Sequence, residues 1–171
     1  KKIAKTHFDV GYSNESGVRE LVENAGALMG EIELDAERQV MNSFLSELIK
    51  AAPRATYGEV MVRDALGRGA IDKLLISEGL RKNTISLQCG SCKHEWTATV
   101  GRMEALPSCP SCDASGDNAK ELNSVSLIDD LGKMAERSNT EIIYISVDTE
   151  EGSQLLNGFG GLAALCRYPM M

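Results

Sequence analysis

The sequence predicts an α/β fold, a three-layer α/β/α sandwich interrupted by a small cysteine-rich insertion. Two observations predict the sandwich: segments with apolar residues at helical spacing alternate with short apolar runs typical of buried strands, and no internal repeat is present. A third observation predicts the insertion: the alternation of helical and strand-like segments is interrupted over 84–118, and this segment contains four of the five cysteines. With 171 residues the chain is long enough to bury a core.

The N-terminal third is expected to be largely helical. Residues 1–14 have the weak alternation and turn-forming residues of a junction with a preceding domain. Apolar residues at helical spacing predict a helix over 18–29, ended by Gly30. A second helix is expected over 35–49, with Asp35 as its N-cap.

Helices and strands alternate through the rest of the chain. Residues 58–66 predict a short helix, and 71–77 a buried strand. After the insertion, 127–135 predict a helix and the β-branched run at 142–147 a strand. A helix is expected at 149–156, and a final apolar stretch follows it. We therefore expect the sandwich to be built from 15–83 and 119–171.

The insertion at 84–118 contains two C-x-x-C pairs separated by sixteen residues: Cys89, Cys92, Cys109 and Cys112. This spacing is typical of a four-thiolate zinc site, in which each pair forms a tight turn supplying two ligands. Four protein ligands leave no position for water, so the expected zinc ion, one per chain, is structural. The alternatives are two unrelated pairs of thiols, a redox motif without its usual βαβ context, or His94 as a competing ligand.

Composition excludes several classes of protein. The net charge is −7 and aromatic residues make up 5%, which argues against a phosphate-backbone binder, including a DNA-binding protein, and against a base-stacking surface. Residues 119–171 carry most of the negative charge and suit a basic protein surface. No apolar run approaches the ~20 residues needed to cross a membrane. Five cysteines without a secretion signal indicate a reducing compartment, the cytoplasm.

The residues of an enzyme site are missing, so we predict a non-catalytic domain. The sequence lacks the HExxH, Walker A and G-x-S-x-G motifs, and its two histidines, His7 and His94, lie far apart. The glycine-rich run 158–161 is expected to follow a helix and precede a strand, the reverse of a dinucleotide-binding loop. Phe159 between these glycines is either an exposed interface anchor or part of a helix C-cap without another role.

At this point the sequence resembles a known family. The run 151–168 is similar to the C-terminal signature of the class 1 peptide chain release factors of archaea and eukaryotes. Further segments agree with that family: 10–13, 17–18, 56–60, 65–66 and 69–76. The complete cysteine set favours the archaeal factors. The third domain of the ribosome-rescue factor Pelota is an alternative.

The resemblance implies a fold similar to the ribosomal L7Ae/L30e proteins, with a zinc-bearing minidomain. In the family, stop-codon recognition and peptide release belong to two other domains, and the Gly-Gly-Gln tripeptide of the releasing domain is absent here. The implied role is docking a translational GTPase, in archaea the elongation factor that delivers aminoacyl-tRNA. The ribosome and its recycling ATPase are further implied partners. Six positions carry over as GTPase-facing: Gly158, Phe159, Gly160, Gly161, Arg167 and Tyr168.

One other function remains open at this stage. Because L7Ae-like domains bind kinked RNA in other proteins, the chain is alternatively an RNA-binding module. The net charge of −7 and the scarcity of aromatic residues argue against it.

Overall fold

The computed structural model describes residues 9, 11 and 15–170 of the chain. The expected junction at 1–14 therefore lies almost wholly outside the described residues. The chain forms two compact units, divided between Ser43 and Phe44.

The first element is one helix rather than the expected two. Helix α1 runs without interruption over Glu15–Leu48. The prediction that Gly30 ends a helix was wrong, because a glycine inside a helix costs only about 1 kcal/mol relative to alanine and does not by itself stop it. Asp35 was also wrongly assigned as an N-cap, since it lies within α1 and pairs with Arg38 at 3.8 Å. No helix in the described ranges combines the length and apolar character needed to span a membrane.

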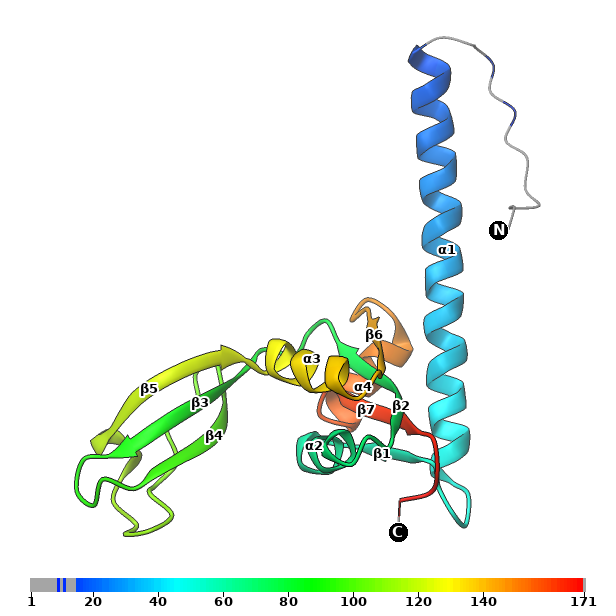
Figure 1. Ribbon diagram of the computed structural model, residues 1–171. Helices are drawn as coiled ribbons and strands as arrows, with labels where there is room; N and C mark the ends of the chain where they lie inside the picture. Colours follow the sequence, from blue (N-terminus) through cyan, green and yellow to red (C-terminus); the bar gives the residue numbers. More distant parts are fainter. Residues whose placement is uncertain (1–8, 10, 12–14, 171) are drawn as a thin grey trace. The chain divides into compact units, whose positions relative to one another are not determined.

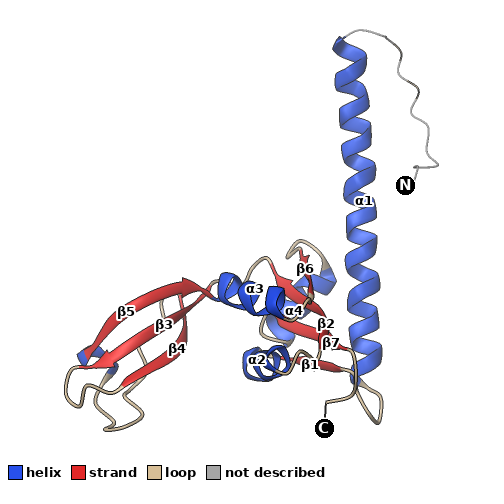
Figure 2. Cartoon of the chain, viewed as in Figure 1, coloured by secondary structure: helices blue, strands red, loops and turns tan. Residues whose placement is uncertain are grey.

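The second unit contains a four-stranded mixed sheet with strand order β1-β7-β2-β6 (Figure 2). Strands β2 and β6 are parallel, whereas β7 runs antiparallel to both β1 and β2. The bounds are β1 Ala55–Tyr57, β2 Ile71–Ser77, β6 Glu141–Ile145 and β7 Leu162–Cys166. The expected strand at 71–77 is confirmed, and the mixed α/β class with it.

Three helices pack on this sheet: α2 Glu59–Gly67, α3 Leu127–Arg137 and α4 Glu150–Gly158. The main apolar cluster joins α2 and α3 to one face of the sheet, through inward residues such as Leu74, Leu131 and Ala164. Strand alternation turns Leu75 and Ala163 to the opposite face, where they are also fully buried. Helix α4 contacts β2, β6 and β7. Both faces of the sheet are therefore covered.

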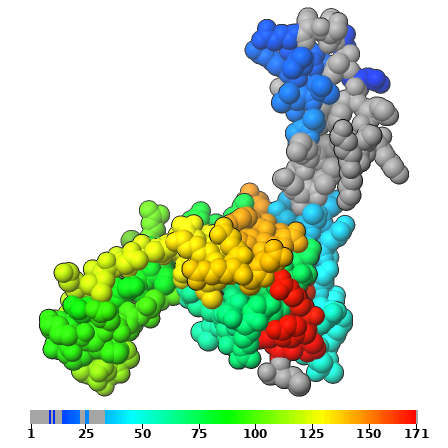
Figure 3. Space-filling view, viewed as in Figure 1, coloured from blue at the N-terminus to red at the C-terminus, as the bar shows by residue number. Residues whose placement is uncertain are grey.

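A separate three-stranded antiparallel sheet, with strand order β4-β3-β5, forms the inserted region (Figure 1). Its strands are β3 Lys82–Cys89, β4 Glu95–Gly101 and β5 Ala119–Ser126, with a short 3₁₀ turn η1 at Gly116–Asn118. The expected boundaries of the insertion were 84 and 118, and the sheet extends beyond both. In the space-filling view its residues form a lobe beside the atoms of α3 (Figure 3).

A polar cluster joins this lobe to the core. Arg63 of α2 pairs with Glu59 at 2.9 Å and with Asp130 of α3 at 2.8 Å. It also donates to the Thr84 hydroxyl on β3, and Thr99 on β4 donates to Glu59. Burial alone would lower the pKa of Arg63, but the hydrogen bonds with Glu59 and Asp130 outweigh it and raise that pKa. One guanidinium thus links two helices to the second sheet.

Candidate metal centre and docking surface

The four cysteines of the insertion meet at the end of the second sheet that is remote from α3. Their Sγ atoms all lie within 4.8 Å of one another. Cys89 and Cys112 approach to 3.6 Å, and so do Cys92 and Cys109. A tetrahedral zinc ion with Zn–S bonds of ~2.3 Å separates its ligands by about 3.8 Å. These two distances are close to that separation, and all four sulfur atoms are near enough to share one such ion.

Each C-x-x-C pair forms the same turn. In both, the amide four residues after the first cysteine donates to that cysteine's carbonyl: Lys93 N–H to Cys89 O at 3.1 Å, and Asp113 N–H to Cys109 O at 2.9 Å. The amide of the first cysteine donates in return to the carbonyl five residues on. Lys93 and Asp113 both have positive φ, at 63° and 56°. The two turns thus present their thiols in equivalent geometry.

The first turn is fixed by the segment before β5. The Gly90 amide donates to the Asn118 carbonyl at 2.8 Å, and the Asn118 side chain donates to the Ser91 hydroxyl at 2.8 Å. A Cβ at Gly90 would lie 2.6 Å from that carbonyl, closer than such contacts allow. Glycine is therefore required between the first two cysteines.

The thiols influence one another's ionisation. The backbone N–H of Cys92 favours a thiolate and lowers the pKa of Cys89 to about 6. The backbone N–H of Ala114 likewise favours the Cys112 thiolate, but the sulfur atoms of Cys92 and Cys89 outweigh it and raise the pKa of Cys112 to about 12. Cys89 therefore ionises more easily than a free thiol and Cys112 less easily, and a bound divalent cation would favour the thiolate form of both.

The cluster fits a structural metal ion better than a catalytic one. Four thiolates fill a tetrahedral shell and leave no site for water or substrate. Among the described residues, the metal-ligating group contains these cysteines and no histidine. His94 is exposed and its ring lies parallel to that of Trp96, with centroids 6.4 Å apart.

The glycine-rich run lies where the sequence predicted it, between α4 and β7. The Phe159 and Gly161 amides both donate to the Leu155 carbonyl, which closes the C-terminal end of α4. Gly160 and Gly161 have φ of 71° and 80°, a backbone conformation that favours glycine. The helix C-cap interpretation of this run therefore has direct geometric support.

Phe159 itself is half-buried, intermediate between the exposed anchor and the helix C-cap that the sequence left as alternatives. Its ring packs edge-on against Phe44, with centroids 5.1 Å apart, and against Tyr57, at 5.2 Å. The sequence alone does not reveal these contacts, because the two rings come from the end of α1 and from β1, which are distant from Phe159 in the chain. Tyr57 remains 48% exposed and forms the outer side of this aromatic cluster, defined as Phe44, Tyr57 and Phe159.

Arg167 and Tyr168 lie at the opposite end of β7. The Arg167 guanidinium donates to the carbonyls of Gly69, Ser138 and Asn139 at 2.8–3.1 Å, and thereby joins the loops that follow α2 and α3. The Tyr168 hydroxyl donates to the carbonyl of Arg68 at 3.4 Å. Both side chains support local structure while remaining exposed.

The six positions suggested by the family resemblance therefore do not form one contiguous surface. Gly161 accepts from the Ser77 amide at the end of β2, whereas the Arg167 amide donates to Ala70, just before β2 begins. At ~3.3 Å per residue, the strand between them separates the two groups by roughly 20 Å. Sequence reasoning also missed Tyr57, whose proximity to Phe159 depends on the pairing of β1 with β7.

Comparison with known proteins identifies the family. The family described as "eRF1 domain 3" matches residues 34–170. The chain is 36% identical over 163 residues to peptide chain release factor subunit 1-1 of Methanosarcina acetivorans, and 40% identical over 166 residues to peptide chain release factor subunit 1 of Thermococcus kodakarensis. Each alignment covers 94% of this chain and 39% of the relative, so the chain spans about two-fifths of their length.

Solved structures agree. The C-terminal domain of the peptide chain release factor from Methanosarcina mazei superposes with a TM-score of 0.74 at 35% identity, over 92% of this chain and 98% of that one. Archaeoglobus fulgidus Pelota shares the fold, with a TM-score of 0.55 at 20% identity over 94% of this chain and 39% of that one. The chain therefore belongs to the eRF1 domain 3 family, the C-terminal domain of the archaeal peptide chain release factors.

Proposed function

We propose that this chain is the docking domain of an archaeal translation termination factor, that it binds an elongation-factor-type GTPase, and that it catalyses no reaction itself. The observation that carries the proposal is the match to a release factor C-terminal domain, over nearly the whole of both chains. As part of such a factor it would act on the ribosome, in the cytoplasm.

The partner surface is proposed to lie at one end of β7. The aromatic cluster offers a half-exposed tyrosine on a rigid base of two rings, the kind of anchor enriched in interfaces. The opposite end offers Arg167 and the equally exposed Tyr168. Because the two ends lie far apart, we assign the GTPase to one of them, the aromatic cluster, which also includes the glycine-rich turn.

A second partner is proposed from the shared fold. One structural relative, at a TM-score of 0.58 and 17% identity, is described as ribosome-bound archaeal Pelota with ABCE1. We propose that a recycling ATPase of that kind also docks on this domain. The likeness to Pelota leaves the third domain of a ribosome-rescue factor as the other candidate, which the higher identity to release factors disfavours.

The inserted sheet is proposed to be a zinc minidomain on an L7Ae-like core, with one structural zinc ion held by Cys89, Cys92, Cys109 and Cys112. The sulfur spacing and the two matching turns support this assignment. A closed four-thiolate shell also supports a non-catalytic domain, because it leaves no open coordination position.

Three tyrosines of nearly equal exposure allow a controlled test of the docking surface: Tyr57 at 48%, Tyr168 at 47% and Tyr144 at 48%. Each is replaced by alanine, and binding to the GTP-bound GTPase is measured by calorimetry. We expect Tyr57→Ala to weaken binding at least about tenfold, as for an interface anchor, and Tyr144→Ala on the edge strand β6 to leave it unchanged.

The outcomes separate the alternatives. Loss of affinity with Tyr168→Ala alone would move the GTPase to the other end of β7. If all three variants bind the GTPase as tightly as the unmodified chain does, docking at either end of β7 is contradicted. Circular dichroism and zinc content of each variant show that the fold is intact.

A further inference from the structure

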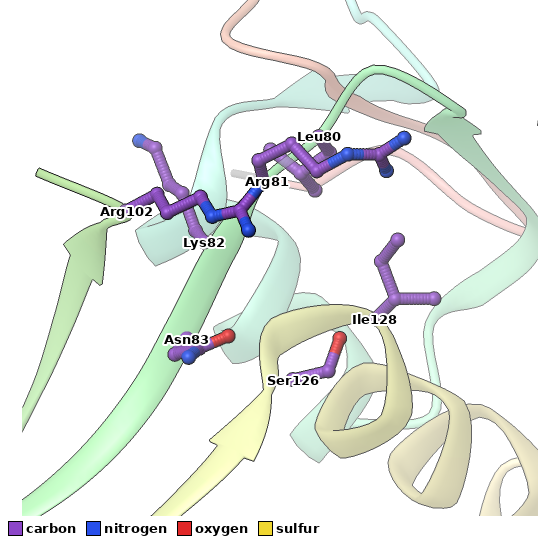
Figure 4. A pocket seen from close by; sticks show the side chains of 7 residues that line it. All are labelled: Leu80, Arg81, Lys82, Asn83, Arg102, Ser126 and Ile128. Atoms are coloured by element: carbon purple, nitrogen blue, oxygen red, sulfur yellow. The ribbon is translucent and has the colours of Figure 1, made fainter.

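A pocket of about 230 Å³ lies where the second sheet meets the core (Figure 4). Two strand pairings build it. Lys82 pairs with Gly101, which places Arg102 beside the start of β3, and Asn83 pairs with Ser126 at the end of β5. In Figure 4 the side chains of Arg81, Lys82 and Arg102 start on one side, opposite those of Asn83 and Ser126, and their charged ends point in different directions. The volume is below the ~300 Å³ of a typical cofactor site and suits a smaller group.

The charge of the pocket opposes that of the chain. Three cations and no carboxylate line it, although the net charge of the protein is −7. Within residues 15–170, no ion pair involves Arg81, Lys82 or Arg102. Arg81 donates to the Glu78 carbonyl at 2.8 Å, which holds its guanidinium without neutralising it. Three basic side chains thus line one pocket without an ion-pair partner among the described residues, and their charged ends are spread along its rim.

Two acidic side chains near this region bind other groups, and a third points to solvent. Glu104, two residues beyond Arg102, accepts from the Gly101 amide at 2.6 Å. Asp130 in the first turn of α3 pairs with Arg63. Asp129 beside it is exposed. No carboxylate of the described chain therefore fills the pocket.

Hydrogen-bond donors and an apolar floor complete the site. Ser126 precedes α3 but its hydroxyl does not cap the helix, and neither that hydroxyl nor the Asn83 amide has a hydrogen-bond partner among the described residues. Leu80 is 4% exposed and Ile128 is half-buried, so the floor is apolar and strengthens the field of the cations. Arginine, lysine, serine and asparagine are the residues that contact phosphate oxygens in nucleic-acid complexes.

We propose that this pocket binds the sugar–phosphate backbone of RNA. The side chains that line it include no aromatic residue on which a base could stack, so the contact is to phosphate and independent of sequence. We take this RNA to be ribosomal RNA, which rests on the proposed function. The recognition of phosphate by the pocket does not depend on that function. The net charge excludes a general RNA-binding surface but not one local contact of three cations.

The test is fluorescence anisotropy of a labelled oligouridine with the purified chain, over a series of salt concentrations. With three phosphate contacts, log affinity should fall against log salt with a slope of roughly −2. The triple variant Arg81→Gln, Lys82→Gln, Arg102→Gln should bind at least about tenfold more weakly, with a slope near zero. The single variant Arg102→Gln, in an exposed loop, should lose about threefold and covers the case in which the triple variant is unstable.

The matched control removes three other unpaired, exposed cations and the same amount of charge: Lys120→Gln, Lys133→Gln, Arg137→Gln. It should change affinity less than about threefold, because distant exposed charges are screened by salt. Equal losses in the two triple variants would overturn the proposal. The proposal would also be overturned if the unmodified chain did not bind oligouridine at low salt. Tighter binding of polyglutamate than of oligouridine would overturn it too, and would indicate that the pocket binds an acidic protein.

The same preparations separate this inference from the docking proposal. The pocket variant should still bind the GTPase, since the pocket and the aromatic cluster share no residue. RNA binding lost with GTPase binding kept supports the phosphate site. RNA binding unchanged in the pocket variant overturns it, whatever the GTPase result.

Discussion

The two sheets of this chain are stabilised in different ways. Fourteen buried residues form one apolar cluster on the four-stranded sheet and its helices. The three-stranded sheet buries far fewer apolar residues. On its central strand only Ile85, Leu87 and Cys89 are buried, and the middle of β5 is exposed on both faces. Its remaining support comes from the four cysteines at one end and the Arg63 cluster at the other.

The difference follows from size. The second sheet with its turns spans roughly 45 residues, close to the ~40 below which a domain usually needs metals or disulfides. Metal binding can then supply the folding free energy that a small core lacks. The core should therefore respond to changes in apolar packing, and the second sheet to removal of the metal.

The largest expected effect is that of Cys109→Ser. Cys109 is buried within the cluster, and its loss leaves three ligands. Structural zinc contributes ~10–16 kcal/mol of apparent binding free energy in small zinc domains, so we expect the second sheet to lose its order while the core keeps its own. Elemental analysis and amide NMR spectra measure the two effects.

The matched control is Cys166→Ala, which also removes one thiol. Cys166 is buried in β7 and belongs to the apolar cluster, not to the cysteine group. This variant should keep one zinc ion per chain. A Cys109→Ser protein that also kept one zinc ion would contradict the assignment of the ligands.

The next effect is that of Leu74→Ala in the centre of the core. Leu74 is fully buried between β2 and its covering helices. The truncation should lower the free energy of unfolding by about 2–5 kcal/mol, measured by urea denaturation, because it leaves a cavity. Zinc content below the transition should not change. A loss of zinc in the folded variant would show that the two sheets are not stabilised separately.

A smaller effect is expected at the junction of the two sheets. Arg63→Gln removes the partner of Glu59 and Asp130, and should cost about 1–2 kcal/mol of unfolding free energy, because these groups are only partly buried. A double-mutant cycle with Asp130→Asn should give a coupling of about 1 kcal/mol. A coupling near zero would mean that this ion pair is screened and does not stabilise the junction.

The smallest effect is that of Gly160→Ala. Gly160 has φ of 71° and open space at its Cβ position, so only backbone strain opposes the change, at about 1 kcal/mol. Gly132→Ala in α3, where a Cβ also meets no atom, is the control and should stabilise by about 0.5–1 kcal/mol. Thermal unfolding midpoints that shift in the same direction for both would refute the role of the turn.

Sequence patterns predicted the local features well. The strand at Ile71–Ser77, the helix that begins at Glu59 and the two C-x-x-C turns all depend on residues that are close in the sequence. The continuity of α1 was missed, since the cost of Gly30 is small against the backbone hydrogen bonding of a long helix.

Features that depend on strand pairing were not predictable. The aromatic cluster requires β1 to pair with β7, and the basic pocket requires β3 to pair with both β4 and β5. The separation of Phe159 from Arg167 likewise follows from the antiparallel course of β7. The sequence gives only the separation of these residues along the chain, whereas the pairing and register of the strands determine which of them are in contact.

Native-state hydrogen exchange, with and without a zinc chelator, tests most directly whether the two sheets are stabilised independently. The account predicts that chelation removes protection from the amides of β3, β4 and β5, while those of β2 and β7 remain protected. Uniform loss of protection across both sheets, or no loss in either, would contradict it.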